Sequence, residues 1–133
     1  MRRFVSDACS VIDASALLAL VFGERLTVAR EAFESGILST VNLAETLTKM
    51  VDVGATADAA MADIEALGLN LTIVAFDRDA AVLAADLRAG TKHLGLSLGD
   101  RACLAAARSR GLSPLTADRA WAKLRDFKVI PIR

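Results

Sequence analysis

Three residue types that commonly build chemical sites are scarce in this 133-residue sequence, which has two cysteines, one histidine and no tyrosine. Cys9 and Cys103 are far apart and form no motif typical of a disulfide framework or a thiolate metal site. With His93 as the only histidine, neither a Ser-His-Asp triad nor a paired-histidine metal site is expected. The cysteine usage agrees with a reducing compartment.

Long apolar runs are also missing. The longest, residues 16–22, is far shorter than the roughly 20 residues that a transmembrane helix needs. A basic start at Arg2 and Arg3 does not continue into a secretory signal, because Asp7 and Asp13 precede the apolar run. We therefore expect a single soluble domain over residues 1–133, located in the cytoplasm and without membrane contact.

Neither sign of charge is in excess, since 16 basic residues balance 16 acidic residues. This neutrality argues against a strongly basic nucleic-acid-binding protein. The two halves differ, however: residues 1–66 hold five basic and ten acidic residues, whereas residues 67–133 hold eleven and six. The second half therefore offers positive charge to a polyanion, although ordinary solvated surfaces explain the same distribution.

Apolar periodicity and turn residues predict an alternation of strands and helices. Strands are expected at 9–13, 37–39, 69–76, 114–116 and 129–132. Helices are expected at 15–22, 26–34, 42–53, 56–67, 77–92, 97–110 and 118–124. This order predicts an α/β fold, a three-layer αβα sandwich with a central parallel sheet of about five strands. Pro131 places the last strand at an edge of the sheet.

Four acidic residues follow predicted strands or lie near the starts of predicted helices: Asp13, Glu45, Asp100 and Asp118. Parallel strands end at one edge of their sheet, where α/β proteins bind ligands, so we expect these carboxylates to meet there. Oxygen ligands without a histidine or cysteine cluster favour Mg²⁺ or Mn²⁺ over Zn²⁺. Helix capping is the alternative for each acid, and the spacings Asn42-x-x-Glu45 and Ser97-x-x-Asp100 are those of capping boxes.

Four segments carry a family resemblance: 11–17 (VIDASAL), 41–45 (VNLAE), 94–104 (LGLSLGDRACL) and 115–121 (LTADRAW). They resemble segments of PIN-domain ribonucleases, and specifically of VapC-type toxins of bacterial toxin–antitoxin pairs. The resemblance implies one PIN-like domain in which the four acids bind Mg²⁺ or Mn²⁺, with Ser15 and Thr116 as polar neighbours. It also implies a homodimer and a cognate antitoxin as partner.

A carboxylate-bound ion of this kind activates water, so we predict a hydrolytic ribonuclease that leaves a 5′-phosphate and a 3′-hydroxyl. Asp13 and Asp100 are the expected central ligands, while Glu45 and Asp118 bind the ion directly or through water. Basic residues near the predicted site are candidates for RNA phosphate contacts: Arg88, Lys92, Arg101 and Arg119. We expect His93 to be a surface residue beside them and Trp121 to be a packing anchor.

Apolar side chains of the predicted helices 16–22 and 26–34, with Leu43, Leu47 and Met50, have two interpretations. The family resemblance implies a groove beside the acids that an antitoxin tail fills. Packing into the core is the simpler alternative.

Two functions other than a ribonuclease toxin remain open. A receiver-like phosphoacceptor module is loosely matched by Asp77, Thr116 and Lys128 near the ends of three strands, but the first strand offers only one acid. A catalytically silent domain that binds RNA or a partner protein is the other alternative. Residues Met1 to Ala8 are assigned no role.

Overall fold

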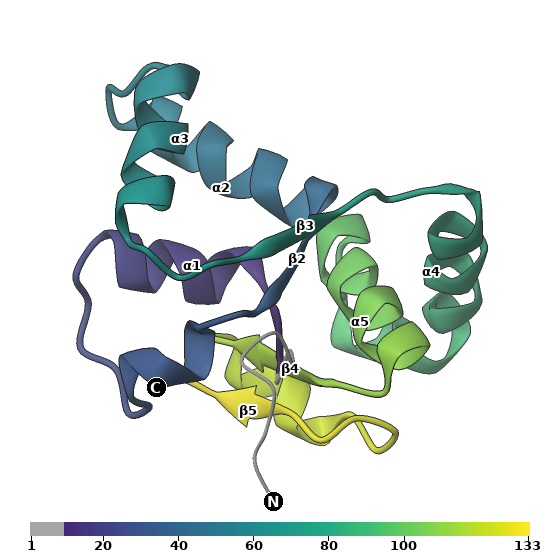
Figure 1. The fold of residues 1–133 in the computed structure, drawn as a ribbon. Coiled ribbons are helices and arrows are strands. Elements are labelled where there is room, and N and C mark those ends of the chain that lie inside the picture. The colour runs from purple at the N-terminus through teal and green to yellow at the C-terminus, as the bar shows by residue number, and fades with distance from the viewer. Residues whose placement is uncertain (1–9) are drawn as a thin grey trace, which may run out of the picture.

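Five short strands run parallel through the centre of the molecule in the spatial order β3-β2-β1-β4-β5 (Figure 1). The computed structural model describes residues 10–133. The strands are β1 (Ser10–Ile12), β2 (Ile37–Ser39), β3 (Thr72–Val74), β4 (Ser113–Thr116) and β5 (Ile130–Pro131). The helices are α1 (Ala14–Val21), η1 (Arg30–Phe33), α2 (Thr40–Asp52), α3 (Ala57–Ala66), α4 (Arg78–Thr91), η2 (Lys92–Leu94), α5 (Leu98–Arg110) and η3 (Arg119–Lys123). Within these residues, no helix is long and apolar enough to cross a membrane.

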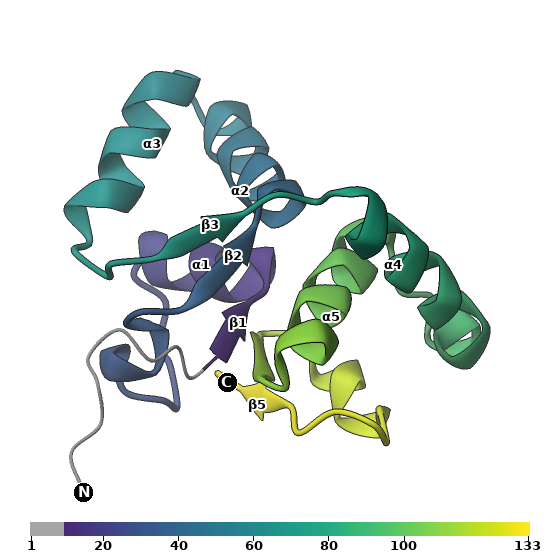
Figure 2. The same cartoon turned by 45° about the vertical axis from the view of Figure 1, so that its right-hand side comes forward.

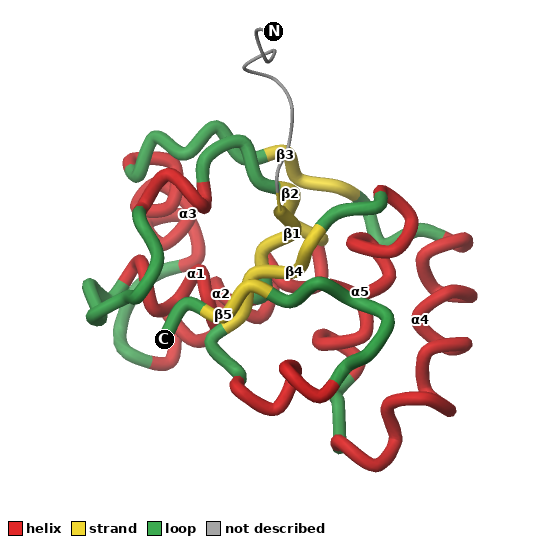
Figure 3. Tube along the Cα trace, turned by 90° about the horizontal axis from the view of Figure 1, so that it is seen from below, coloured by secondary structure: helices red, strands yellow, loops and turns green. Residues whose placement is uncertain are grey.

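Helices cover both faces of the sheet, which confirms the predicted three-layer αβα sandwich. α1, α2 and α3 lie on one side of the strands, and α4 and α5 lie on the other (Figures 2 and 3). Neighbouring residues of a strand point to opposite faces. Ile12 and Leu38 therefore enter the core beneath α1 to α3, whereas Val11 and Ile37 enter the core beneath α4 and α5. The predicted edge position of the last strand is also confirmed, because β5 ends the sheet beside β4.

α5 is the helix most closely packed on the sheet. Every residue from Ala102 to Ala107 is buried. Four of these six side chains are alanine, and small side chains allow a helix backbone to approach a sheet closely. α5 contacts β1, β2 and β4 as well as α2 and α4. Its first turn is thereby fixed relative to the ends of the central strands.

Two predicted elements differ from the structure. Residues 26–34, predicted as an amphipathic helix, form a loop that ends in the short turn η1. The Thr27 amide donates to the Ile132 carbonyl at 2.6 Å, so the loop pairs with the chain beyond β5 instead of forming helical turns. The strand predicted over 69–76 is shortened to β3, because Asn70 interrupts the extended backbone with a φ of 56°.

The chain changes direction along the sheet between β1 and β4. β1, β2 and β3 follow one another toward one edge, and the chain then returns to place β4 on the other side of β1. Where connections leave two adjacent strands in opposite directions, their carboxyl ends border the crevice in which open α/β sheets bind ligands. Residues that directly follow β1 and β4 therefore border the expected site.

Candidate active site

Asp13 directly follows β1 at this crevice. It is only 3% exposed, and its Oδ2 accepts hydrogen bonds from Ser15 Oγ at 2.5 Å and from Thr116 Oγ1 at 3.0 Å. Asp13 is the residue before α1, but its carboxylate makes no capping bond to that helix, so the capping interpretation of Asp13 is wrong. The two hydroxyl residues expected beside it are its hydrogen-bond partners.

Burial raises the pKa of Asp13 to about 6. The hydroxyls of Ser15 and Thr116 oppose this rise because they bond to the charged form, whereas the negative charges of Asp100 and Glu45 add to it. None of the salt bridges found in residues 10–133 involves these three acids. The Asp13 anion is therefore less favourable in the folded protein than in water, and a bound positive charge would stabilise it.

Glu45 lies in the second turn of α2 and is held by a contact with α5. Ser39 is the N-cap of α2, and its Oγ accepts from the Val41 amide at 3.2 Å, so Asn42 lies inside the helix and the capping-box interpretation of Glu45 is wrong. Asn42 is fully buried, and its Nδ2 donates to Glu45 Oε1 at 3.1 Å and to the Gly99 carbonyl at 3.0 Å. Serine and asparagine are equally good N-caps, so the sequence alone does not distinguish an Asn42 that caps the helix from one that lies inside it.

Asp100 lies in the first turn of α5, where the predicted capping box is present. Ser97 Oγ accepts from the Asp100 amide at 3.1 Å, and Asp100 Oδ2 accepts from the Ser97 amide at 2.9 Å. The same side chain borders a hollow of about 210 Å³, lined by Asp13, Ala14, Ser15, Leu18, Glu45, Lys49 and Asp100. Three of the four predicted acids thus lie around one hollow at the carboxyl edge of the sheet.

Asp118, the fourth predicted acid, is not among the residues that line this hollow. It is exposed and caps η3, with its Oδ1 accepting from the Ala120 amide at 2.9 Å, as the capping alternative predicts. Its own amide donates to Thr116 Oγ1 at 3.0 Å, and Thr116 in turn bonds to Asp13. The backbone of Asp118 is therefore connected to the hollow while its carboxylate stabilises a neighbouring turn.

The acids around the hollow fit a hard divalent cation by their chemistry. Carboxylate oxygens are the ligands that Mg²⁺ and Mn²⁺ prefer, and a cation stabilises negative charges that lie together. In the described part of the chain, however, no three acidic, histidine or cysteine side chains already form a group arranged to hold a metal ion. Binding an ion therefore requires these side chains to turn toward it.

The basic residues predicted to contact phosphates have different surroundings. Arg88, Lys92 and Arg119 are exposed. Arg101 is partly buried, and its Nη1 donates to the Ala84 carbonyl at 3.0 Å, which joins α5 to α4. Three of the four candidates are therefore free of such a structural bond to a neighbouring helix.

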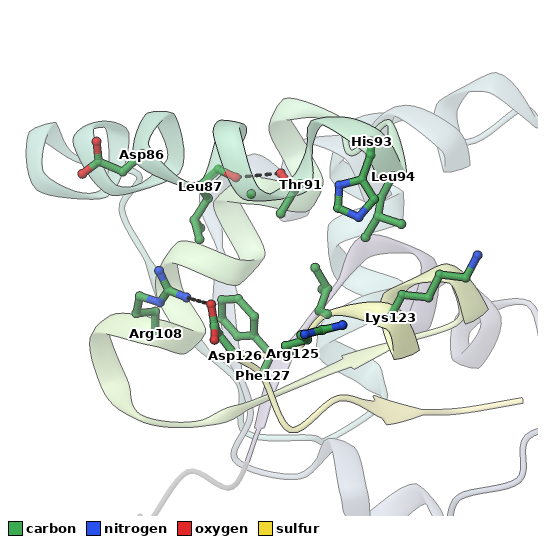
Figure 4. A pocket seen from close by; sticks show the side chains of 12 residues that line it. Asp86, Leu87, Thr91, His93, Leu94, Arg108, Lys123, Arg125, Asp126 and Phe127 are labelled. Atoms are coloured by element: carbon green, nitrogen blue, oxygen red, sulfur yellow. Dashed lines mark hydrogen bonds and ion pairs between the residues drawn. The ribbon is translucent and has the colours of Figure 1, made fainter.

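A larger cavity, of about 410 Å³, lies between α4 and the segment that follows η3 (Figure 4). His93 borders it from η2, where it is exposed as expected, and Lys123 and Arg125 border it from the opposite wall. Arg108 pairs with Asp126 at 3.6 Å and lies 4.9 Å from the centroid of the Phe127 ring. The cavity thus mixes both signs of charge with apolar surface.

Trp121 is fully buried, which confirms its predicted packing role.

Comparison with known proteins identifies the family of this chain. Residues 10–126 match the PIN domain, whereas curated protein sequences gave no match. The chain is similar to VapBC-5, a member of the VapBC family of toxin–antitoxin systems from Mycobacterium tuberculosis, with 26% identity, a TM-score of 0.61, and coverage of 94% of this chain and 99% of that chain. It is also similar to DNA-bound VapBC from Salmonella typhimurium, with 16% identity, a TM-score of 0.70, and coverage of 94% and 98%. A toxin–antitoxin complex from Klebsiella pneumoniae has 21% identity, a TM-score of 0.63, and coverage of 89% and 94%.

These matches agree with the sequence resemblance. The matched residues include every strand and helix that carries an acid of the hollow. PIN-domain proteins are nucleases and generally use divalent metals. The family match and the VapBC neighbours are together consistent with a VapC-type toxin. The chain belongs to the PIN-domain family.

Proposed function

We propose that this protein is a Mg²⁺- or Mn²⁺-dependent ribonuclease that acts as the VapC-type toxin of a toxin–antitoxin pair. The observation that carries the proposal is the buried carboxylate of Asp13 at the β1–β4 crevice, with Glu45 and Asp100 lining the same hollow. Asp13 makes no capping bond and pairs with no cation among the described residues. Its burial as an anion is best explained by a bound ion that compensates its charge.

In this proposal, Asp13, Glu45 and Asp100 hold the ion, and Asp118 contributes from beside the hollow. When bound, the ion supplies an activated water and stabilises charge on a phosphodiester oxygen. The hydroxyls of Ser15 and Thr116 keep Asp13 in one orientation because both bond to the same carboxylate oxygen. Attack of water on phosphorus with cleavage of the P–O3′ bond leaves a 5′-phosphate and a 3′-hydroxyl.

RNA is the proposed substrate, with Arg88, Lys92 and Arg119 contacting its phosphates. These exposed side chains lie at the end of α4, in η2 and next to Asp118. We expect Arg101 to contribute least of the four predicted contacts, because its guanidinium already donates to the Ala84 carbonyl.

A cognate antitoxin and a second copy of the chain are the proposed partners, in the cytoplasm. The similarity to VapBC complexes supports the antitoxin. Of the apolar residues predicted to border its groove, Met50 is buried in the core, and Leu43 and Leu47 are partly buried against it. Leu18 lines the hollow itself, so an antitoxin tail that covers this residue also covers the acids.

The proposal is tested with purified protein and defined RNA in the presence of Mg²⁺ or Mn²⁺. We expect the protein to cut RNA and EDTA to stop the reaction. Asp13→Asn and Asp100→Asn should lower the rate at least about 100-fold while the far-UV spectrum of the folded chain is kept. Cleavage at the wild-type rate by a folded Asp13→Asn protein would falsify the assignment.

Asp77→Asn serves as the matched control and also tests the receiver alternative. Asp77 follows the edge strand β3 and caps α4 by accepting from the Ala80 amide at 2.9 Å, so it lies outside the hollow. We expect Asp77→Asn to cleave RNA like the wild type. Incubation with a small phosphodonor should add no mass to either protein, whereas a receiver would gain a phosphoryl group at this residue.

A further inference from the structure

Gly99 lies in the first turn of α5 with the carboxylate of Glu45 packed against it. A Cβ added to Gly99 would stand 2.2 Å from Glu45 Oε2 and 2.4 Å from both Oε1 and the carboxyl carbon. These separations are far below van der Waals contact. The carboxylate of Glu45 therefore occupies the space that a side chain at residue 99 would need.

Backbone conformation does not explain this glycine. Gly99 is absent from the positive-φ residues of the described chain and lies within the helix. Alanine is more favourable than glycine at a helical position. Free space for Glu45 is thus the feature that distinguishes glycine from alanine at this residue.

Asn42 holds the same carboxylate through its side-chain amide. Its Nδ2 bonds to Glu45 Oε1 and also to the Gly99 carbonyl, so one buried amide connects the acid on α2 to the first turn of α5. Asp100 is the next residue of that turn. The position of Glu45 relative to Asp100 is therefore defined by a bond from Asn42 and by the absence of a side chain at Gly99.

We infer that Gly99 is a positioning residue that, together with Asn42, places the Glu45 carboxylate for ion binding. This inference rests on the proposed function, because it assigns a role to Glu45 in that site. The inference predicts a local effect of substituting Gly99. A single methyl group at residue 99 must displace the tip of Glu45, which is flexible, and leave the helix and the core in place.

The test compares Gly99→Ala with Gly90→Ala. Gly90 also lies within a helix, and a Cβ there would meet nothing within 4 Å, so it controls for the general effect of replacing glycine by alanine. We expect the metal-free Gly99→Ala protein to melt no lower than the wild type. Its Mn²⁺ affinity, measured by calorimetry, should fall by about 10- to 100-fold, the range found when a residue that orients a metal ligand is lost. Gly90→Ala should bind Mn²⁺ like the wild type.

A second arm repeats the comparison in a Glu45→Ala background. If Gly99 acts through Glu45, Gly99→Ala should cause no further loss of Mn²⁺ affinity once the carboxylate is gone. A further loss in that background, an unfolded Gly99→Ala protein, or wild-type Mn²⁺ affinity in Gly99→Ala each overturns the inference. If Gly99→Ala binds Mn²⁺ with wild-type affinity while the wild-type protein cleaves RNA, the inference about Gly99 fails and the proposed function survives. If the wild type neither binds Mn²⁺ nor cleaves RNA, both fail.

Discussion

At the scale of single residues, burial of Asp13 couples stability to pH. The pKa of this carboxyl rises from the ordinary value of 3.8 to about 6 on folding. Between these values the folded protein keeps a proton that the unfolded chain has lost. The contribution of Asp13 to the stability of the metal-free protein is therefore most favourable below this window and is lost as the pH rises through it.

Asp13→Asn removes this penalty. We expect the metal-free variant to be more stable than the wild type at about pH 7.5, by on the order of 2 kcal/mol. The difference should shrink toward zero below about pH 3, where Asp13 is protonated in both the folded and the unfolded wild type. Urea denaturation in EDTA at several pH values measures it. Asp77→Asn removes an exposed capping carboxylate and should give no such gain in stability.

Sequence reasoning located the acids and the two hydroxyl residues beside Asp13, but not the groups that hold Glu45. Asp13, Glu45 and Asp100 are predictable because each stands at a strand end or in the first turns of a helix. The role of Asn42 is hidden because a capping box and a bond within a helix share the same three-residue spacing. The space at Gly99 cannot be predicted either, since it depends on how closely α5 approaches α2.

At the scale of elements, local capping chemistry predicts helix starts, while distant contacts decide the rest. Thr56, Asp77 and Ser97 are N-caps whose side chains bond to their helices. The segment 26–34 has helical periodicity, yet its backbone bonds to the chain beyond β5. A partner that lies so far along the sequence leaves no local pattern.

Ser97→Ala tests the cap of α5. The substitution removes the bond from the Asp100 amide, so we expect the free energy of unfolding to fall by about 1 kcal/mol. The control is Ser109→Ala in the last turn of the same helix, where Oγ donates to the Ala106 carbonyl at 3.2 Å and accepts from Arg110 Nη1 at 3.1 Å. We expect this substitution to change the free energy of unfolding by no more than about 0.5 kcal/mol. Urea denaturation measures both, and equal losses would contradict a special role of the cap.

At the scale of the whole molecule, the fold class follows from the order of strands and helices, but the position of the site depends on strand order. The sequence predicts five strands and does not reveal that β4 lies beside β1. That neighbour relation brings Thr116 to Asp13. The excess of basic residues in the second half of the chain agrees with the proposed RNA binding, because all the proposed phosphate contacts come from that half.

Arg88→Gln tests this division of charge in an Asp13→Asn background, in which the proposed function predicts that RNA is bound but cut at least about 100-fold more slowly. We expect RNA binding to weaken and the slope of log affinity against log salt to decrease by about 1, as for one lost phosphate contact. Arg78→Gln is the control, because Arg78 lies at the other end of α4 and pairs with Asp79 at 3.4 Å. Fluorescence anisotropy with labelled RNA measures both variants, and identical slopes would remove Arg88 from the binding surface.

The bond between Thr116 and Asp13 joins residues that are 103 positions apart. On the ribosome, the hydrogen bonds around Asp13 are therefore incomplete until β4 has been synthesised and has joined β1. Every shorter nascent chain lacks one of the two hydroxyls that orient Asp13. Under the proposed function, the order of synthesis therefore delays cleavage of RNA, including the protein's own messenger RNA, until β4 has joined β1.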